Sequence, residues 1–378
     1  MAVNYIGTAL VLNCGSSSVK YQVVDTTLDA PLASGLVERV TDHGLAIREI
    51  IERLSLPDSG VDLSQITAVG HRVLHGGEEF SAPTIIDDEV ERKIALLAPL
   101  GPLHIPANLA GISAAREAFP NTPHVANFDT AYFQTMSEAA YTYAIDKNVA
   151  AEHSIRKYGF HGTSYAYLAH EAPRVMGKRP DEVNIIALHL GNGASACAMR
   201  AGRAIDTSMG LTPLAGLVMG TRTGDIDPAV AFHLGRSAGM TLDEIDHLFN
   251  RQSGMLGLTG YSDMRDVEQA AADGAHDAQL GLEIYCRRIR GYVGQYYAQL
   301  GHLDAIVFTA GVGENSDVVR LQSLVGLSEL GIILDPERNA GRKKQATLIS
   351  ADESAVEVWV VPTNEEREIA LQSIAAVS

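Results

Sequence analysis

The stretch ALVLNCGSSSVKYQVVD, residues 9–25, predicts two strands joined by a tight turn. Ala9 to Leu12 form an apolar run typical of a buried strand, and Val19 to Val24 form a second run after the turn. The turn holds three hydroxyls, a glycine and Lys20. Backbone N–H groups, hydroxyls and an ammonium directed at one point bind a phosphate. A Ser-rich hairpin turn without a ligand is the alternative, because Gly and Ser are ordinary turn residues.

The same pattern returns in the middle of the chain. Residues 184–190 predict a strand, GNGAS at 191–195 a tight turn, and residues 196–199 a returning strand. A third apolar strand, at 305–308, runs into TAGVGENS at 309–316, which we expect to be another Gly-rich loop. Further strands are expected at 68–75, 124–128, 204–206 and 356–361, and helices at 89–100, 106–119, 278–300 and 366–377. The repetition predicts two duplicated α/β domains with a ligand in the cleft between them.

Composition limits the class of protein. A chain of 378 residues predicts two or three domains and a core large enough to need no disulfides. The three cysteines (Cys14, Cys197, Cys286) are widely spaced and form no CxxC pair, which argues for a reducing compartment and against structural zinc. With 46 acidic and 29 basic residues the net charge is −17, so we expect no binding to nucleic acid or anionic membranes. No apolar run resembles a leader or a membrane span, and we expect a cytoplasmic protein.

Two classes of phosphate-binding motif can be tested against the sequence. The Walker A pattern GxxxxGK[ST] is absent. Residues 191–196 match the dinucleotide fingerprint GxGxxG/A, but that motif needs a helix next, and a β-hairpin is expected here. A dehydrogenase is therefore disfavoured. Three Gly loops at strand ends, residues 13–18, 191–195 and 311–316, instead indicate ATP bound across two domains.

Two arginines lie in Gly-rich segments that could supply positive charge for phosphoryl transfer. Arg72 lies in GHRVLHGG at a strand end, and Arg222 lies in the loop MGTRTGDIDP, residues 219–228. For Arg222 the alternative is a surface ion pair with Asp225 or Asp227.

Three further polar residues have a structural alternative. His161, in YGFHGTS, could be a buried histidine with satisfied hydrogen bonds. His189 is expected to support the second Gly loop, and Asp129, after the strand at 124–128, could cap a following helix.

With these residues assembled, the chain resembles the acetate kinase family, part of the superfamily of sugar kinases, Hsp70 and actin. The resemblance covers nearly the whole chain and rests on long motifs at residues 12–20, 70–77, 128–131, 158–164, 189–195, 206–228, 309–316 and 362–366. It implies an α/β fold of two duplicated actin-like ATPase domains, each with an RNase H-like βββαβαβα core, and an interdomain active-site cleft. The expected domains are 1–130 with 366–378, and 131–365.

The resemblance also implies an activity. It is a reversible, Mg²⁺-dependent, in-line transfer of phosphate between ATP and acetate that gives ADP and acetyl phosphate, with propionate as the alternative acid. The implied cofactors are ATP or ADP and Mg²⁺, with Mn²⁺ as a substitute, and the implied assembly is a homodimer. A carboxylate is already ionised near neutral pH, so this chemistry needs no general base. A nucleotide-driven switch of the same fold, without catalysis, is the rival from another class.

Residue roles follow from the matching positions. The resemblance implies that Arg72 and Arg222 clamp the carboxylate and the phosphoryl group, that Asp129 orients them, and that His161 donates a hydrogen bond to the equatorial oxygens. It places Mg²⁺ on Asn13 and Glu365, largely through water. The implied nucleotide-binding residues are Asn13, Ser16, Ser18, Lys20, His189, Asn192, Gly193, Asp263, Arg265, Gly311, Val312, Gly313 and Asn315. The implied acyl pocket consists of Arg72, Leu74, Leu103, Phe160 and Pro213.

The chain departs from the family pattern at a few positions near these motifs. Ile105 replaces an asparagine, Phe133 and Tyr165 each replace a histidine, and Thr223 stands where cysteine or serine is common. None of these changes removes a proposed catalytic group. We expect them to alter local loop packing and, through the pocket, substrate preference.

Overall fold

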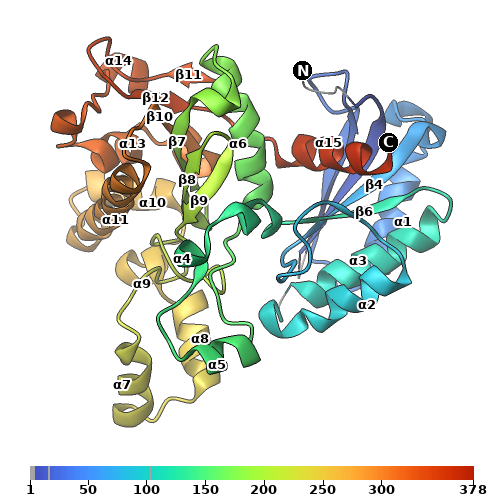
Figure 1. Ribbon diagram of the computed structural model, residues 1–378, viewed down its shortest axis with the longest axis horizontal. Helices are drawn as coiled ribbons and strands as arrows, with labels where there is room; N and C mark the ends of the chain where they lie inside the picture. Colours follow the sequence, from blue (N-terminus) through green and yellow to red (C-terminus); the bar gives the residue numbers. More distant parts are fainter. Residues whose placement is uncertain (1–4, 16–17, 103) are drawn as a thin grey trace. The chain divides into compact units, whose positions relative to one another are not determined.

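The computed structural model describes residues 5–15, 18–102 and 104–378 and forms two compact units (Figure 1). The first unit comprises Met1–Gln134, His161–Tyr167 and Asn364–Ser378, and the second comprises Thr135–Phe160 and Leu168–Thr363. The domain bounds expected from the sequence stay a prediction. No helix among the described residues is long and apolar enough to cross a membrane.

The first unit is built on a six-stranded mixed sheet with the order β3-β2-β1-β4-β6-β5. Its strands are β1 (Thr8–Cys14), β2 (Ser18–Asp25), β3 (Ala33–Glu38), β4 (Ile66–Val73), β5 (Thr84–Ile85) and β6 (His124–Phe128). The first three are antiparallel, β4 and β6 run parallel to β1, and β5 closes the edge antiparallel to β6. The turn after residue 14 is therefore a hairpin, in which Asn13 lies opposite Lys20.

Helices cover both faces of this sheet. They are α1 (His43–Leu54), α2 (Asp88–Leu96), α3 (Ile105–Ala118) and α15 (Glu365–Val377). Ile369 and Ile374 of α15 pack on Ala9 and Val11, while α1 and α3 share a core with Leu10 and Leu12 on the other face. Because β1 is buried on both faces, its sequence is a continuous apolar run and does not alternate.

The second unit repeats this sheet with the order β11-β12-β10-β7-β8-β9. Its strands are β7 (Asn184–Leu190), β8 (Ala194–Arg200), β9 (Arg203–Thr207), β10 (Ala305–Thr309), β11 (Thr347–Leu348) and β12 (Glu357–Val360). The antiparallel hairpins β7–β8–β9, the parallel strands β10 and β12, and the antiparallel edge β11 match the first sheet strand for strand. The predicted duplication of two actin-like α/β domains is confirmed.

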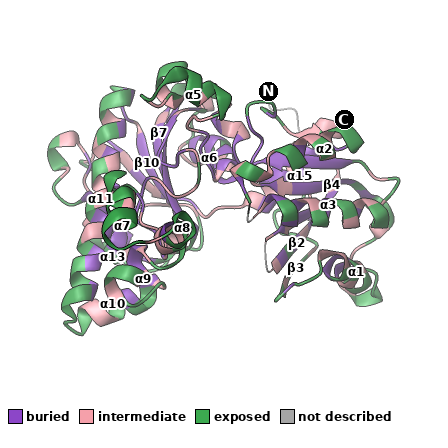
Figure 2. Cartoon of the chain, turned by 90° about the horizontal axis from the view of Figure 1, so that it is seen from below, coloured by how far each residue is buried: buried purple, intermediate pink, exposed green. Residues whose placement is uncertain are grey.

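Among the described residues, five helices of the second unit lie in the connection from β9 to β10. They are α7 (Ala229–Ser237), α8 (Leu242–Arg251), α9 (Gly254–Thr259), α10 (Met264–Ala272) and α11 (His276–Leu300). Further helices are α4 (Glu138–Tyr141), α5 (Lys147–Glu152), α12 (Ala310–Asn315), α13 (Asp317–Leu324) and α14 (Pro336–Asn339), and α6 (Gly162–Val175) has residues in both units. Figure 2 shows buried residues along β4 in the first unit and along β7 and β10 in the second.

The structure corrects several predicted elements. The expected Gly loop at 309–316 is wrong: β10 extends to Thr309, Ala310 takes a left-handed backbone (φ 65°), and α12 follows directly. The second turn is shorter than expected, because β8 already begins at Ala194. The helix predicted to reach residue 100 ends at Leu96, since Pro99 has no N–H to continue the α-helical hydrogen bonds, and a 3-10 helix at Ala98–Leu100 follows.

Candidate active site

A buried ion pair lies at the carboxyl ends of the central strands of the first unit. Arg72 is next to last in β4, and Asp129 directly follows the neighbouring parallel strand β6. The guanidinium donates two hydrogen bonds to one carboxylate, from Nε to Oδ1 at 2.9 Å and from Nη2 to Oδ2 at 2.7 Å. The Asp129 side chain is 1% exposed. A bidentate pair of this kind fixes the plane of the guanidinium as well as its charge.

A second carboxylate approaches the same arginine. Glu365, the first residue of α15, places Oε2 3.5 Å from Nη1 of Arg72. Burial acts to lower the pKa of Arg72, but the charges of Asp129 and Glu365 outweigh it and raise that pKa overall. Burial raises the pKa of Glu365; Asp129 and Glu366 act in the same direction, against Arg72 and Lys20. A cation bound beside Glu365 would therefore favour its ionised carboxylate and lower its pKa.

The predicted phosphate-loop lysine has a partner in the first unit. The Nζ atom of Lys20 lies 2.5 Å from Oε1 of Glu366, whose side chain is 10% exposed. Sequence reasoning missed Glu366; its only signal was its position beside Glu365. Ser18 opens β2, and its carbonyl accepts a hydrogen bond from Gly15 N at 2.8 Å. Ser16 lies outside the described residues.

His161 is tied to the ion pair through the backbone. Gly162 N donates to the carbonyl oxygen of Asp129 at 3.0 Å. A Cβ atom on Gly162 would lie 2.0 Å from that oxygen, so only glycine permits this approach. His161 itself has a left-handed backbone (φ 62°), which is strained for a non-glycine residue. Residues with strained backbones of this kind are concentrated at functional sites.

The oxygen donors of the first unit suit a hard cation. Mg²⁺ retains several waters and needs only one or two carboxylates from a protein. Asn13, at the end of β1, and Glu365 offer an amide and a carboxylate oxygen. Among the described residues there is no group of three or more His, Cys, Asp or Glu arranged to hold a metal. An amide and a carboxylate oxygen are donors that suit a largely hydrated Mg²⁺.

The second unit contains a cavity of about 550 Å³, within the usual range for small ligands. Six of the predicted nucleotide-binding residues line it: Asn192, Asp263, Arg265, Gly311, Val312 and Asn315. It also has lining residues that sequence reasoning did not find, among them Met255, Glu268, Tyr285, Ser316 and Arg342. Ser316 is the last residue of the motif at 309–316, whereas the others come from α9, α10, α11 and the segment after α14, where no motif marked them.

Paired side chains shape the cavity wall. Asp263 caps α10 by accepting from Arg265 N at 2.9 Å, and Arg265 also binds it through its side chain. These hydrogen bonds lower the pKa of Asp263 to about 2, and the side-chain bond from Arg265 contributes most. Arg342 Nε donates to Asn315 Oδ1 at 2.7 Å. The wall thus presents two guanidinium groups beside a nucleoside-sized space.

Three predicted nucleotide-binding residues of the second unit are not among those that line the cavity. His189 is buried on β7, and Gly193 closes the turn by accepting from Gly191 N at 3.1 Å. Gly313, on α12, accepts from Arg320 Nη1 at 2.9 Å. Their roles toward a ligand stay predictions.

Arg222 lies on a loop beside this cavity. Its Nη1 donates to the carbonyl oxygen of Pro213 at 3.0 Å and approaches the sulfur of Met219 at 3.8 Å. Burial, followed by the charge of Arg251, lowers the pKa of the guanidinium, which nevertheless stays protonated. Gly220 N donates to Asn192 O at 2.9 Å and so joins the loop to the cavity wall.

The ion-pair alternative for Arg222 is wrong. The carboxylate of Asp225 lies 3.6 Å from Arg288, and that of Asp227 accepts from Ala229 N at 2.8 Å. Two acyl-pocket candidates are in this unit: Phe160, which is buried, and Pro213. Leu74 is in the first unit, where its N–H donates to Asn108 Oδ1 at 3.1 Å. Leu103 lies outside the described residues.

Comparison with known proteins places the chain in a family. A model of the acetokinase family matches residues 8–52 and 39–371. An acetate kinase of Leifsonia xyli subsp. xyli is 52% identical over 395 residues, covering 99% of this chain and 100% of that protein.

Solved structures agree over the same length. The structure of Porphyromonas gingivalis acetate kinase aligns with a TM-score of 0.94 at 40% identity, covering 98% of this chain and 100% of the other. A propionate kinase from Francisella tularensis subsp. tularensis aligns with a TM-score of 0.91 at 38% identity, covering 97% and 99%. The whole fold is therefore shared, and the chain belongs to the acetokinase family.

Proposed function

We propose that this protein is an acetate kinase, which transfers the γ-phosphoryl group of ATP to acetate and also runs in reverse. The observation that carries the proposal is the Arg72 guanidinium, held by two hydrogen bonds to the buried Asp129 at the carboxyl ends of parallel strands. In open α/β sheets ligands bind outside these strand ends. A fixed planar cation there suits an anion that must approach a polyanion.

The reaction forms one bond and breaks one. A carboxylate oxygen of acetate attacks the γ-phosphorus, and the bond from that phosphorus to the β–γ bridging oxygen breaks, so ADP leaves with the electron pair. No proton moves, because acetate is ionised near neutral pH. The barrier is mainly charge repulsion, and positioned cations lower it. An arginine of this kind is worth ~10³ to 10⁵ in rate, or ~4 to 7 kcal/mol.

Each proposed role uses a group whose surroundings support it. Arg72, oriented by Asp129, and Arg222 bind the acetate carboxylate and the transferring phosphoryl group. His161 donates to an equatorial phosphoryl oxygen, and its position follows from the bond of Gly162 to Asp129. Asn13 and Glu365 hold Mg²⁺ through water. That ion supplies positive charge to the phosphate oxygens when bound.

The cavity of the second unit takes the nucleoside in this proposal. Asp263, Arg265, Val312 and Asn315 line it and contact adenosine. The turn at Asn192 and the hairpin turn after Asn13, with Ser16, Ser18 and Lys20, bind phosphates. His189, Gly193, Gly311 and Gly313 shape the second phosphate site.

Propionate kinase activity is the second candidate, favoured by the likeness to the Francisella tularensis propionate kinase. The acids differ by one methylene, worth ~1 to 3 kcal/mol in an apolar pocket. In the proposed pocket the additional methylene of propionate contacts Leu74, Leu103, Phe160 or Pro213. Acetate is our choice.

We further propose that the enzyme is a cytoplasmic homodimer. The three cysteines are unpaired and buried, which suits a reducing compartment. Helix α7 contains no buried residue, and Val230 and Phe232 are exposed on it. An apolar helix without a cover suits an interface between two copies. Light scattering of purified protein should give twice the mass of one chain.

A hydroxylamine trap tests the activity directly. Purified protein is incubated with ATP, Mg²⁺ and hydroxylamine together with acetate, propionate, butyrate or glycerol. We expect acyl hydroxamate to form fastest with acetate and only when the metal is present. Fastest turnover with propionate would favour the second candidate, and no hydroxamate from any acid would overturn both.

A further inference from the structure

The loop that carries Arg222 is closed at its base by a carboxylate. Asp225 N donates to Gly216 O at 2.9 Å, and Gly216 N donates back to Oδ1 of Asp225 at 2.7 Å. The backbone of Gly216 has a left-handed φ of 101°, and a Cβ atom there would lie 2.7 Å from Ser208 O. Residues 216–225 therefore form a closed loop whose two ends are joined by main chain and one side chain.

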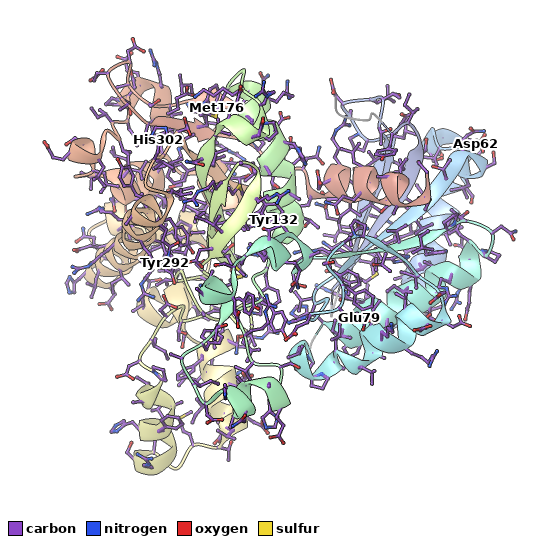
Figure 3. The ribbon with its side chains drawn as sticks, in the orientation of Figure 1. Asp62, Glu79, Tyr132, Met176, Tyr292 and His302 are labelled. Atoms are coloured by element: carbon purple, nitrogen blue, oxygen red, sulfur yellow. The ribbon has the colours of Figure 1, made fainter. Side chains whose placement is uncertain are left out.

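Helix α11 holds this base in place. Tyr292, labelled in Figure 3, donates its hydroxyl to Oδ2 of Asp225 at 2.6 Å. One turn earlier, Arg288 Nη1 donates to Gly216 O at 3.1 Å and to Asp225 O at 3.0 Å. The helix in turn packs on β7 and β8, and its residues Ile289 and Val293 are fully buried. A hydrogen bond from a hydroxyl to an ionised carboxylate is about twice as strong as one between neutral groups.

The other side of the loop rests on the start of α9. Ser253 N donates to Thr221 O at 3.0 Å, and Thr223 N donates to Phe249 O at 3.1 Å, so both neighbours of Arg222 are held. Gly254 lies directly against the loop, because a Cβ atom on it would be 2.6 Å from the carbonyl oxygen of Arg222. The backbone of Arg222 is thus fixed from two directions.

We propose that Asp225, held by Tyr292, is a positioning residue that sets where the Arg222 guanidinium lies for phosphoryl transfer. The inference rests on the catalytic role proposed above for Arg222. The carboxylate of Asp225 is bound by Gly216, Tyr292 and Arg288 and acts on Arg222 through two intervening residues of backbone. A displacement of a reacting group by about 1 Å costs on the order of 10²-fold in rate. A small loosening at the base of the loop is therefore enough to lower the rate of phosphoryl transfer.

The test compares two conservative variants with matched controls. Tyr292→Phe removes one hydroxyl, and Asp225→Asn removes the charge but keeps the shape. The controls are Tyr297→Phe on the same helix, whose hydroxyl has no protein partner among the described residues, and Asp227→Asn, whose side chain accepts from Ala229 N instead. We expect Tyr292→Phe to lower kcat about tenfold and Asp225→Asn more, with KM for acetate raised. Both controls should keep normal kinetics.

Two further measurements distinguish a positioning role of Asp225 and Tyr292 from a merely structural one. We expect the Kd of ADP with Mg²⁺, from titration calorimetry, to stay within about twofold for both variants, because neither Asp225 nor Tyr292 lines the cavity. We also expect Tyr292→Phe to have little further effect on kcat in an Arg222→Ala background. Long incubation in the hydroxylamine trap keeps that slow background measurable.

The outcomes separate this inference from the proposed function. Equal losses from Tyr292→Phe in the wild-type and Arg222→Ala backgrounds would mean that it acts independently of Arg222, and would overturn the inference. Unchanged kinetics in Tyr292→Phe and Asp225→Asn would do the same. Near-normal kcat in Arg222→Ala itself would instead overturn the role proposed for Arg222.

Discussion

The two units share one sheet and differ in what connects its third and fourth strands. In the first unit the connection from β3 to β4 contains α1 and two short 3-10 helices, Pro57–Ser59 and Leu63–Gln65. In the second, the connection from β9 to β10 contains α7 to α11. The strand orders, including the antiparallel edge strands β5 and β11, are the same.

The longer connection creates a different kind of site. The first unit gathers its polar groups into a buried cluster around Arg72 and Asp129, where the ends of adjacent parallel strands meet. The second unit uses the inserted helices to wall a cavity and to hold the loop of Arg222. The repeated sheet is therefore a common scaffold, and the chemistry depends on what is attached at its strand ends.

The largest expected effect compares the two arginines. Arg72→Ala, in the first unit, and Arg222→Ala, in the second, should each lower kcat by at least ~10³, because each removes a cation from the transferring phosphoryl group. Arg→Lys should also fail at both positions, since an ammonium cannot replace a planar fork. Steady-state kinetics with the hydroxylamine trap measures the loss.

Thermal unfolding and circular dichroism serve as controls for folding. Arg72→Ala leaves Asp129 buried without its partner, so some loss of stability is expected there. A variant of either arginine that folds and retains near-normal kcat would remove that arginine from the mechanism.

Acid should weaken the first unit through its buried histidines. Burial lowers the pKa of His75 from the usual 6.5 to about 4, and burial, with the charge of His124 next, lowers the pKa of His71 well below its usual value. As the pH falls below 6.5, these histidines bind protons in the unfolded chain, whereas in the folded unit they stay neutral to a lower pH. Stability is therefore complete above pH 6.5 and is lost as the pH falls toward 4, by roughly 3 kcal/mol for His75 alone.

Urea unfolding at pH 7.5 and 4.5, with amide hydrogen exchange read separately for β4 and β7, measures this effect. His75→Asn should retain more of its own stability on acidification than the wild type does. Equal loss of protection in both strands would mean that the acid sensitivity is not a property of the first unit.

A pair of glycine substitutions tests how firmly the second unit holds Arg222. Gly254 and Gly260 both have left-handed backbones, with φ of 60° and 83°. A Cβ atom on Gly254 would lie 2.2 Å from Met219 O, whereas one on Gly260 would meet nothing within 4 Å. Gly260→Ala should cost about 1 kcal/mol of backbone strain, and Gly254→Ala at least about 2 kcal/mol.

The kinetic result distinguishes a local from a general effect. Gly254→Ala should also lower kcat, because its new Cβ displaces the backbone of Arg222, while Gly260→Ala should not. Identical stability and kcat in the two variants would contradict the close contact.

The smallest effect concerns two departures from the family pattern in the first unit. Phe133 and Tyr165, which each replace a histidine, are buried and meet edge to face with ring centroids 5.9 Å apart. We expect Phe133→His and Tyr165→His each to destabilise the protein. Their interaction energy should be about 1 kcal/mol in a double-mutant cycle, typical of an aromatic pair. Strict additivity would mean that the two changes are independent.

Local patterns in the sequence were sufficient for the architecture and for many candidate residues. The apolar runs of β1, β7 and β10 predicted strands, and their repetition predicted the duplicated fold. The position of Arg72 and Asp129 near strand ends was also visible, because parallel strands end at a common edge. Of the six nucleotide-binding candidates on the cavity wall, four belong to the motifs at 189–195 and 309–316, and Asp263 and Arg265 were implied by the family resemblance alone.

Only the tertiary structure decided which groups are partners. That Lys20 binds Glu366, that Asp225 binds Tyr292 rather than Arg222, and that Glu268 and Arg342 line one cavity all depend on side chains far apart in the chain. The helix at 310–315 was missed because a glycine-rich segment favours a loop by composition, whereas its place after a buried strand sets its conformation. The periodicity of apolar residues indicates which face of an element is buried. The pairing of charges depends on distances in space, which the spacing of residues along the sequence does not give.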